Sequence, residues 1–122
     1  MSTNASILIA DDDIDLTSTL SEYLSGEHYD VTTAADGEQA ISHLRHKKFN
    51  VAVLDIKMPK VDGFEVLKFI RSDYPDTKTI ILTGYADLMN VMECKKLGAD
   101  DVIEKPYDIG DLFDAIAYVL KK

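Results

Sequence analysis

Short apolar runs alternate along the chain with longer segments in which apolar residues recur every three or four positions. The short runs indicate β-strands, and the longer segments indicate amphipathic helices. One run, VAVLD at 51–55, is apolar up to its last residue, which is typical of a strand covered on both faces. The expected strands are 6–10, 30–34, 51–55, 79–83 and 101–105, and the expected helices are 14–26, 37–47, a segment beginning after Asp62, 86–97 and 109–121.

Polar residues and glycines mark several of the expected helix ends. Asp62 is the expected N-cap of the third helix, and Glu65 three residues later completes a capping-box pattern. Gly98 is the expected C-cap of the fourth helix. The apolar faces expected on the first and third helices consist of Leu16, Leu20, Tyr23 and Leu24, and of Phe64, Leu67 and Ile70.

Five β–α units with short connections predict a single doubly wound α/β domain over residues 1–122. Strands that alternate with single helices imply a five-stranded parallel sheet with helices on both faces. Right-handed crossovers leave few topologies for such a sheet, among them the flavodoxin-like order 2-1-3-4-5, which we expect here. The ligand site of such a sheet lies at the carboxyl ends of its strands.

The composition is that of an ordinary globular domain, with 46% hydrophobic and 29% charged residues. A net charge of −9 argues against direct nucleic-acid binding, which needs a basic surface. No apolar run approaches the roughly 20 residues of a membrane-spanning helix, and the N-terminal MSTNAS lacks the features of a signal peptide, so we expect a cytoplasmic protein. Cys94 is the single cysteine, which excludes an internal disulfide framework and a cysteine-rich zinc site.

Polar residues close four of the five expected strands. Asp11 and Asp12 follow the first strand, Asp55 ends the third, Thr83 ends the fourth and Lys105 ends the fifth. Because parallel strands end at one edge of a sheet, three carboxylates, a hydroxyl and an ammonium are expected together. Clustered carboxylates suit Mg²⁺, and the hydroxyl and ammonium supply donors for a phosphoryl group.

These strand-end motifs resemble those of the response-regulator receiver domain of two-component signalling, and the resemblance covers nearly the whole chain. The residues that carry it are DD at 11–12, LDIKMPKVDG at 54–63, TG at 83–84 and KP at 105–106. Each motif is weak alone, but their order, with each closing its own strand, is specific.

The resemblance implies that Asp55 is the phosphoacceptor and takes its phosphoryl group from a phosphohistidine. Asp12 and Asp55 would bind Mg²⁺ together with the backbone carbonyl of Lys57, and Asp11 would act largely through a metal-bound water. The protein would be a signalling domain and not a turnover enzyme, limited to Mg²⁺-assisted self-phosphorylation and loss of the phosphoryl group by hydrolysis.

The resemblance also implies roles at the fourth and fifth strands. Thr83 would donate a hydrogen bond to the phosphoryl oxygens, and Lys105 would pair with the Asp55 carboxylate or its phosphoryl group; the Lys105–Pro106 bond resembles a cis peptide of the family. Many members carry an aromatic residue three positions before this lysine, where this chain has Val102, and Tyr107 follows the proline instead.

The partners implied by the resemblance are a sensor histidine kinase or a histidine phosphotransfer protein, and an output domain or partner protein that contacts the 86–121 face. Neither nucleic acid nor a membrane is expected as a partner, and a phosphorylation-dependent dimer is compatible with the family. Because the chain ends in LKK after the last helix, we expect either a stand-alone regulator or the receiver portion of a longer protein.

Rival interpretations start from the acidic run DDDIDLT. Asp11, Asp13, Asp15 and Glu22 match the spacing of a calcium loop, but Leu16 stands where that loop needs glycine and a strand precedes it.

DIDLT at 13–17 matches the DxDxT motif of haloacid-dehalogenase-type phosphatases, whose first Asp closes the strand, whereas Asp13 follows Asp11 and Asp12. A flavodoxin-like cofactor binder would need a phosphate loop after the first strand, and none is present. We therefore expect Asp13 and Asp15 to cap and charge the first turn of a helix.

Overall fold

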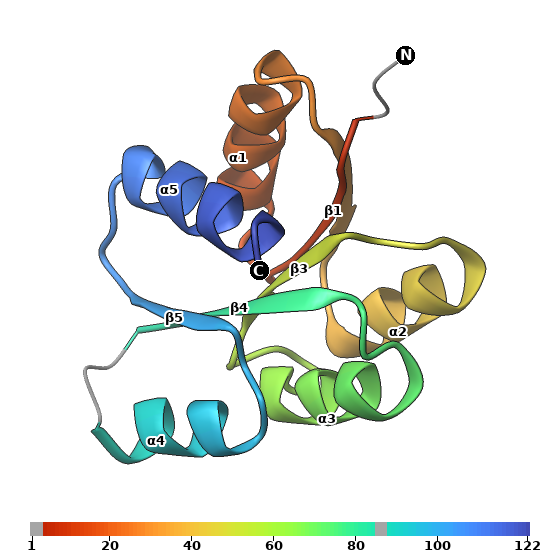
Figure 1. Cartoon of the computed structure of the whole chain (residues 1–122), viewed down its shortest axis with the longest axis vertical. Helices are drawn as coiled ribbons and strands as arrows, with labels where there is room; N and C mark the ends of the chain where they lie inside the picture. Colours follow the sequence, from red (N-terminus) through yellow and green to blue (C-terminus); the bar gives the residue numbers. More distant parts are fainter. Residues whose placement is uncertain (1–3, 85–87) are drawn as a thin grey trace.

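The computed structural model describes residues 4–84 and 88–122, which form a parallel sheet flanked by helices (Figure 1). Its elements are β1 (Ser6–Ala10), α1 (Ile14–Gly26), β2 (Asp30–Ala34), α2 (Gly37–His46), β3 (Val51–Asp55), α3 (Gly63–Asp73), β4 (Lys78–Thr83), α4 (Leu88–Lys96), β5 (Asp101–Glu104) and α5 (Ile109–Leu120).

The five strands are all parallel and lie in the order β2-β1-β3-β4-β5, which confirms the flavodoxin-like prediction. Helices α1 and α5 cover one face of the sheet, and α2, α3 and α4 cover the other (Figure 1). This order places β1 and β3 side by side near the centre of the sheet, with β4 and β5 following on one side.

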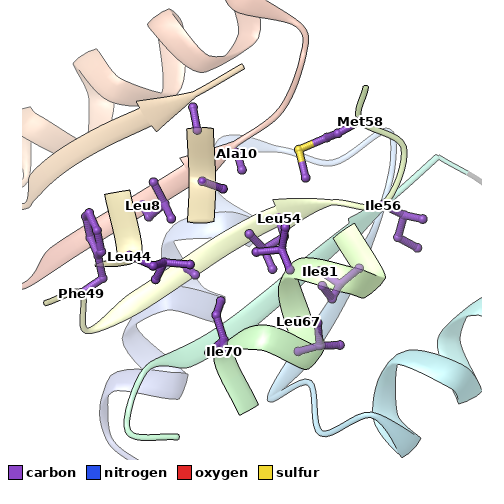
Figure 2. Close-up of a cluster of buried hydrophobic side chains, with 14 of the residues drawn as sticks. Leu8, Ala10, Leu44, Phe49, Leu54, Ile56, Met58, Leu67, Ile70 and Ile81 are labelled. Atoms are coloured by element: carbon purple, nitrogen blue, oxygen red, sulfur yellow. The ribbon is translucent and has the colours of Figure 1, made fainter. Parts of the chain in front are cut away.

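Two apolar clusters fill the space between the sheet and its helices. Successive side chains of a strand point to opposite faces, so a strand covered on both sides must be apolar throughout. In β3, Val51 and Val53 belong to the cluster under α1 and α5, whereas Ala52 and Leu54 belong to the cluster under the other three helices. Figure 2 shows Leu54 in that second cluster, with side chains contributed by the surrounding strands and by α3.

Aspartates stand at the N-caps of α1, α2, α3 and α5. The side chains of Asp13, Asp36 and Asp62 accept hydrogen bonds from the backbone N–H three residues later, at 3.1, 2.8 and 3.0 Å. The predicted N-cap at Asp62 is therefore confirmed, and so is the capping role of Asp13. At the end of α4, Gly98 has a φ of 95°, and its N–H donates to the carbonyl of Lys95 at 3.0 Å, as the predicted C-cap requires.

A few sequence-based expectations differ from the structure. Tyr23, expected on the buried face of α1, is 55% exposed, and Phe64 is only partly buried, because each lies at the edge of its apolar stripe. β4 begins one residue earlier than predicted, at Lys78, and β5 ends at Glu104. Of the helix expected over 86–97, positions 86 and 87 lie outside the described residues.

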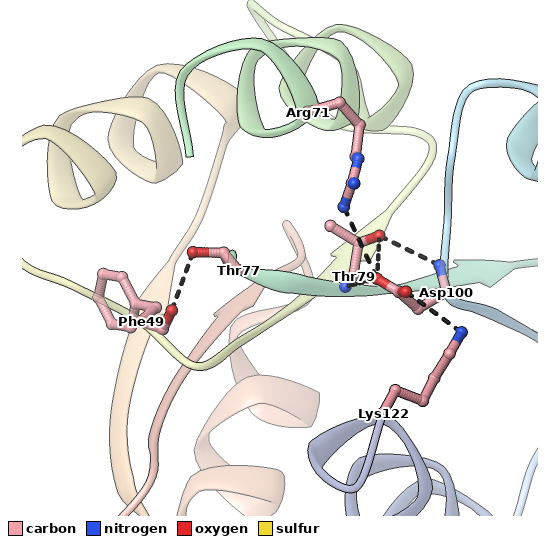
Figure 3. Close-up of polar contacts among 6 residues, drawn as sticks. All are labelled: Phe49, Arg71, Thr77, Thr79, Asp100 and Lys122. Carbon is pink, nitrogen blue, oxygen red and sulfur yellow. Dashed lines mark hydrogen bonds and ion pairs between the residues drawn. The ribbon is translucent and has the colours of Figure 1, made fainter. Parts of the chain in front are cut away.

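A polar cluster around Asp100 joins several elements at the amino edge of β4 (Figure 3). The Asp100 carboxylate accepts hydrogen bonds from the backbone N–H of Thr79 at 2.8 Å and from Lys122 Nζ at 3.3 Å, and Arg71 Nη1 lies 4.0 Å away. Asp100 thus connects the start of β4 to α3 and to the end of α5.

Two glycines allow backbone segments to approach closely. A Cβ at Gly63 would lie 2.8 Å from Ile56 Cα and would overlap the backbone oxygen of Asp55, and a Cβ at Gly37 would overlap the carbonyl of Val61. The Gly63 N–H also donates to the Ile56 carbonyl at 2.8 Å. The first turn of α3 therefore lies directly against the end of β3, and the loop between them rests on α2.

We expect Gly63→Ala to lower the free energy of unfolding by about 1–3 kcal/mol, because the added methyl must displace the β3 backbone. Gly110→Ala is the matched control: it meets no atom within 4 Å, and alanine favours a helix by about 0.5–1 kcal/mol. Urea unfolding of the two variants measures the difference, and equal effects would contradict the close packing at Gly63.

Candidate functional site

The carboxyl ends of β1, β3, β4 and β5 bring the predicted polar residues to one edge of the sheet. Asp11 and Asp12 directly follow β1, Asp55 and Thr83 are the last residues of β3 and β4, and Lys105 directly follows β5. Backbone hydrogen bonds extend the pairing beyond the strands, since the N–H of Lys105 donates to the carbonyl of Thr83 at 2.7 Å. All five predicted side chains thus come from neighbouring positions of one scaffold.

Lys105 bridges two buried carboxylates. Its Nζ lies 3.1 Å from Asp11 Oδ2 and 3.4 Å from Asp55 Oδ2. The other oxygen of Asp11 accepts the backbone N–H of Asp13 at 3.0 Å, so the Asp11 carboxylate, which belongs to a residue 1% exposed, has two donors. One ammonium therefore offsets part of the negative charge of both aspartates.

The charges at this edge shift the proton affinities of two groups. Burial raises the pKa of the Asp55 carboxyl, and the Asp11 carboxylate raises it further, against the opposing effects of Lys105 and a backbone hydrogen bond from Lys57. Burial alone would lower the pKa of the Lys105 ammonium, but Asp55 and Asp11 outweigh burial and raise that pKa above its ordinary value. The site therefore holds an excess of negative charge that favours cation binding.

Asp11, Asp12 and Asp55 form a carboxylate group suited to a divalent cation. One oxygen from each lies within 4.8 Å of the others. Asp12 is exposed whereas Asp11 and Asp55 are buried, so the group is open to water on the Asp12 side. Oxygen ligands with room for bound waters are what Mg²⁺ prefers, and this donor set fits that ion. The carbonyl of Lys57 as a further ligand remains a prediction.

Thr83 and the Lys105–Pro106 peptide complete the predicted set. Thr83 is 2% exposed, and the register that pairs Asp55 with Leu82 brings Thr83 close to Asp55 in the neighbouring strand. The peptide bond between Lys105 and Pro106 is cis, as the resemblance implied.

Val102 and Tyr107 lie on opposite faces of the sheet. Val102 is partly buried in the cluster under α2, α3 and α4, whereas Tyr107 packs against the cluster under α1 and α5. The Tyr107 hydroxyl is buried without a hydrogen-bond partner among the described residues, and burial raises the pKa of this phenol. Sequence reasoning missed this hydroxyl, because its burial depends on how α1 packs beside the β5–α5 loop.

The rival interpretations of the acidic run do not fit the structure. Residues 14–26 form a helix from their first turn, with Asp13 as its cap, so they do not form a calcium loop. Asp13 also lies three residues beyond the end of β1, whereas the phosphatase motif needs its nucleophile to close the strand.

Within the described ranges, no helix is both long and apolar enough to cross a lipid bilayer.

Comparison with known families is consistent with this geometry. The family model described as response regulator receiver domain matches residues 7–117. Sporulation initiation phosphotransferase F of Bacillus subtilis (strain 168) is 35% identical over 113 residues, which cover 93% of this chain and 91% of that protein.

A probable transcriptional regulator, ycf27 of Porphyridium aerugineum, is 39% identical over 116 residues, which cover 95% of this chain and 48% of the relative. The chain thus spans about half the length of several curated relatives that it matches.

Solved structures show the same fold. A CheY-like response regulator receiver domain protein from Methanospirillum hungatei JF-1 superposes with a TM-score of 0.92 at 35% identity, covering 97% of this chain and 94% of that one. The receiver domain of Francisella response regulator 1452 gives a TM-score of 0.91 at 31% identity, covering 97% of this chain and 98% of that one.

The raised pKa of Asp55 predicts a pH-dependent penalty on stability in the absence of metal. The folded chain holds the Asp55 proton more tightly than the unfolded chain, so its stability falls as the pH rises above the unfolded value near 3.8. Because asparagine does not titrate, the stability advantage of Asp55→Asn over the parent should grow with pH. Urea unfolding in a chelator between about pH 3 and 7 measures this trend.

Asp30→Asn provides a control of opposite sign for that pH series. A hydrogen bond from Lys47 lowers the pKa of Asp30, so the parent gains stability from Asp30 as the pH rises toward 3.8. The free energy of unfolding of Asp30→Asn should therefore fall relative to that of the parent as the pH rises toward 3.8. The same slope for both variants would contradict the charge arrangement described for Asp55.

Proposed function

Because this chain belongs to the response regulator receiver domain family, we propose that it accepts a phosphoryl group on the Asp55 carboxylate from the phosphohistidine of a sensor kinase or histidine phosphotransfer protein. The observation that carries this proposal is the convergence of Asp11, Asp12, Asp55 and Lys105 at one edge of the sheet. That arrangement joins a nucleophilic carboxylate, ligands for a cation and a donor for phosphoryl oxygens.

The transfer itself requires little activation of the nucleophile. A lone pair of an Asp55 carboxylate oxygen attacks phosphorus while the P–N bond to the donor imidazole breaks, and the bonding electrons stay with the imidazole nitrogen. Catalysis then consists of positioning and of neutralising charge on the equatorial oxygens. The site holds Asp55 rigidly for this attack, because β3 is buried on both faces and α3 packs against its end.

Magnesium would be held by Asp12, Asp55 and the carbonyl of Lys57, with Asp11 acting through bound water. When bound, the ion supplies positive charge beside the transferring phosphoryl group. Lys105 Nζ, already within 3.4 Å of the Asp55 carboxylate, would donate to a phosphoryl oxygen once the adduct forms.

The phosphorylated state is where the proposed signal arises. Phosphorylation places about −1.5 to −2 charges at one point, which draws Lys105 and the Thr83 hydroxyl toward the phosphoryl oxygens. Loss of the phosphoryl group by hydrolysis returns the resting state. We place the contact with an output domain or partner protein on the 86–121 face, which is also compatible with a phosphorylation-dependent dimer in the cytoplasm.

Incubation with a small phosphodonor and Mg²⁺, followed by intact-mass measurement, tests the acceptor. We expect a single phosphoryl adduct that is absent from Asp55→Asn and absent when the metal is chelated. Sustained release of phosphate from simple phosphoesters, lost in Asp13→Asn and kept in Asp55→Asn, would support a phosphatase instead. Calcium binding with no adduct would support a non-enzymatic metal module.

Replacing Lys105 tests whether its ammonium assists the phosphoryl transfer. Lys105→Gln should slow adduct formation by about 10²-fold, since a positioned donor to the transferring group is lost. Lys68→Gln is the matched control, because Lys68 is exposed and pairs at the surface with Glu65 at 3.2 Å. Time courses of the adduct by intact mass measure both rates, and equal rates would remove Lys105 from the proposed mechanism.

A further inference from the structure

Tyr107 carries a buried polar group that the proposed phosphoryl transfer does not use. Its hydroxyl oxygen is inaccessible to solvent and has no hydrogen-bond partner within residues 4–84 and 88–122. A buried donor without an acceptor raises the free energy of the state that contains it. The free energy of the arrangement in this structure is therefore higher, at Tyr107, than that of an arrangement in which the hydroxyl has a hydrogen-bond partner.

The phenol lies within the electrostatic reach of the phosphoacceptor centre. Tyr107 follows Lys105 by two residues, and the charges that act on the phenol are those of Lys105, Asp11, Asp55 and Asp13. If the Lys105 ammonium moves relative to the two buried carboxylates, the electrostatic potential at the Tyr107 hydroxyl therefore changes. Phosphorylation of Asp55 would produce such a change, because it adds about −1.5 to −2 charges beside Lys105.

A groove beside Tyr107 provides space for the ring to move. The groove has a volume of about 510 Å³ and lies between α1 and the β5–α5 loop. Its walls include Leu16 and Leu20 of α1, together with Ile109, and Lys105 and Tyr107 both line it. A displacement of the Lys105 side chain therefore alters the same space into which the Tyr107 ring can turn.

We propose that Tyr107 is a conformational switch for the phosphorylation site, with its hydroxyl unpaired in the resting chain and hydrated in the groove once Asp55 is phosphorylated. This inference rests on the proposed function. The unpaired hydroxyl destabilises the resting arrangement alone, so it biases the equilibrium toward the phosphorylated arrangement. Removing the hydroxyl should accordingly stabilise the resting state and weaken that bias.

Tyr107→Phe tests the proposal, because it removes only the hydroxyl. In the resting chain we expect the urea midpoint of unfolding to rise by about 0.5 M, since an unsatisfied donor is removed. With Mg²⁺ and beryllofluoride present as the phosphoryl mimic, the gain should disappear. Tyr118→Phe is the control, since Tyr118 is 59% exposed and its hydroxyl should change neither midpoint.

The same gain with and without beryllofluoride would show an inert buried hydroxyl and would overturn the proposal, as would no gain in the resting chain. Intact mass with a small phosphodonor separates this failure from failure of the proposed function. Adduct formation in the parent and in Tyr107→Phe would leave the acceptor role standing, whereas its absence from both would overturn that role and this inference with it.

A second measurement follows the ring directly. In the chain labelled with 3-fluorotyrosine, the ¹⁹F resonance missing from Tyr107→Phe belongs to Tyr107. We expect this resonance to shift on addition of Mg²⁺ and beryllofluoride and to acquire a solvent isotope effect, as the ring reaches water. An unchanged resonance in a chain that binds the mimic would contradict the proposed movement.

Discussion

Lys105 forms ion pairs with both Asp11 and Asp55, and the arrangement of charges at the carboxyl edge of the sheet depends on this shared interaction. Two buried carboxylates would repel each other strongly if neither had a cation nearby. Lys105 Nζ lies within 3.4 Å of both, so one flexible side chain from the end of β5 offsets charge at the ends of β1 and β3. The two ion pairs also link the end of β5 to the ends of β3 and β1, across the intervening strand β4. Charge added at Asp55 would therefore change how the Lys105 ammonium is shared between the two carboxylates.

Most of the fold and most of the site could be predicted from local patterns. The apolar run at 51–55 implies a strand covered twice, and residues that close parallel strands must share an edge, so Asp55 and Lys105 could be placed together before any geometry was known. The exposure of Tyr23 and the buried hydroxyl of Tyr107 could not be predicted. Tyr23 stands at the edge of the apolar stripe of α1, where the helical pattern alone does not decide between burial and exposure. The Tyr107 hydroxyl is buried where α1 packs beside the β5–α5 loop, and contacts between segments so distant in sequence leave no local periodicity.

The two edges of the sheet differ in how well their charges are satisfied. At the amino edge, Asp100 accepts a backbone N–H and a lysine ammonium, with an arginine near it, so that edge has little reason to rearrange. At the carboxyl edge, a single ammonium serves two carboxylates, and a tyrosine hydroxyl beside it is unpaired among the described residues. The fold thus anchors one edge and leaves the other responsive to charge.

The close approach at Gly63 also affects how substitutions in this chain should be interpreted. The residue stands in the motif LDIKMPKVDG that surrounds Asp55, where an intolerance of substitution would ordinarily be attributed to chemistry. Yet the nearest atoms that a side chain there would meet belong to the main chain of Asp55 and Ile56. In a saturation screen, substitutions at position 63 would therefore score as damaging for a steric reason. The preference for glycine would persist in a descendant of this fold that no longer carried the Asp55 carboxylate.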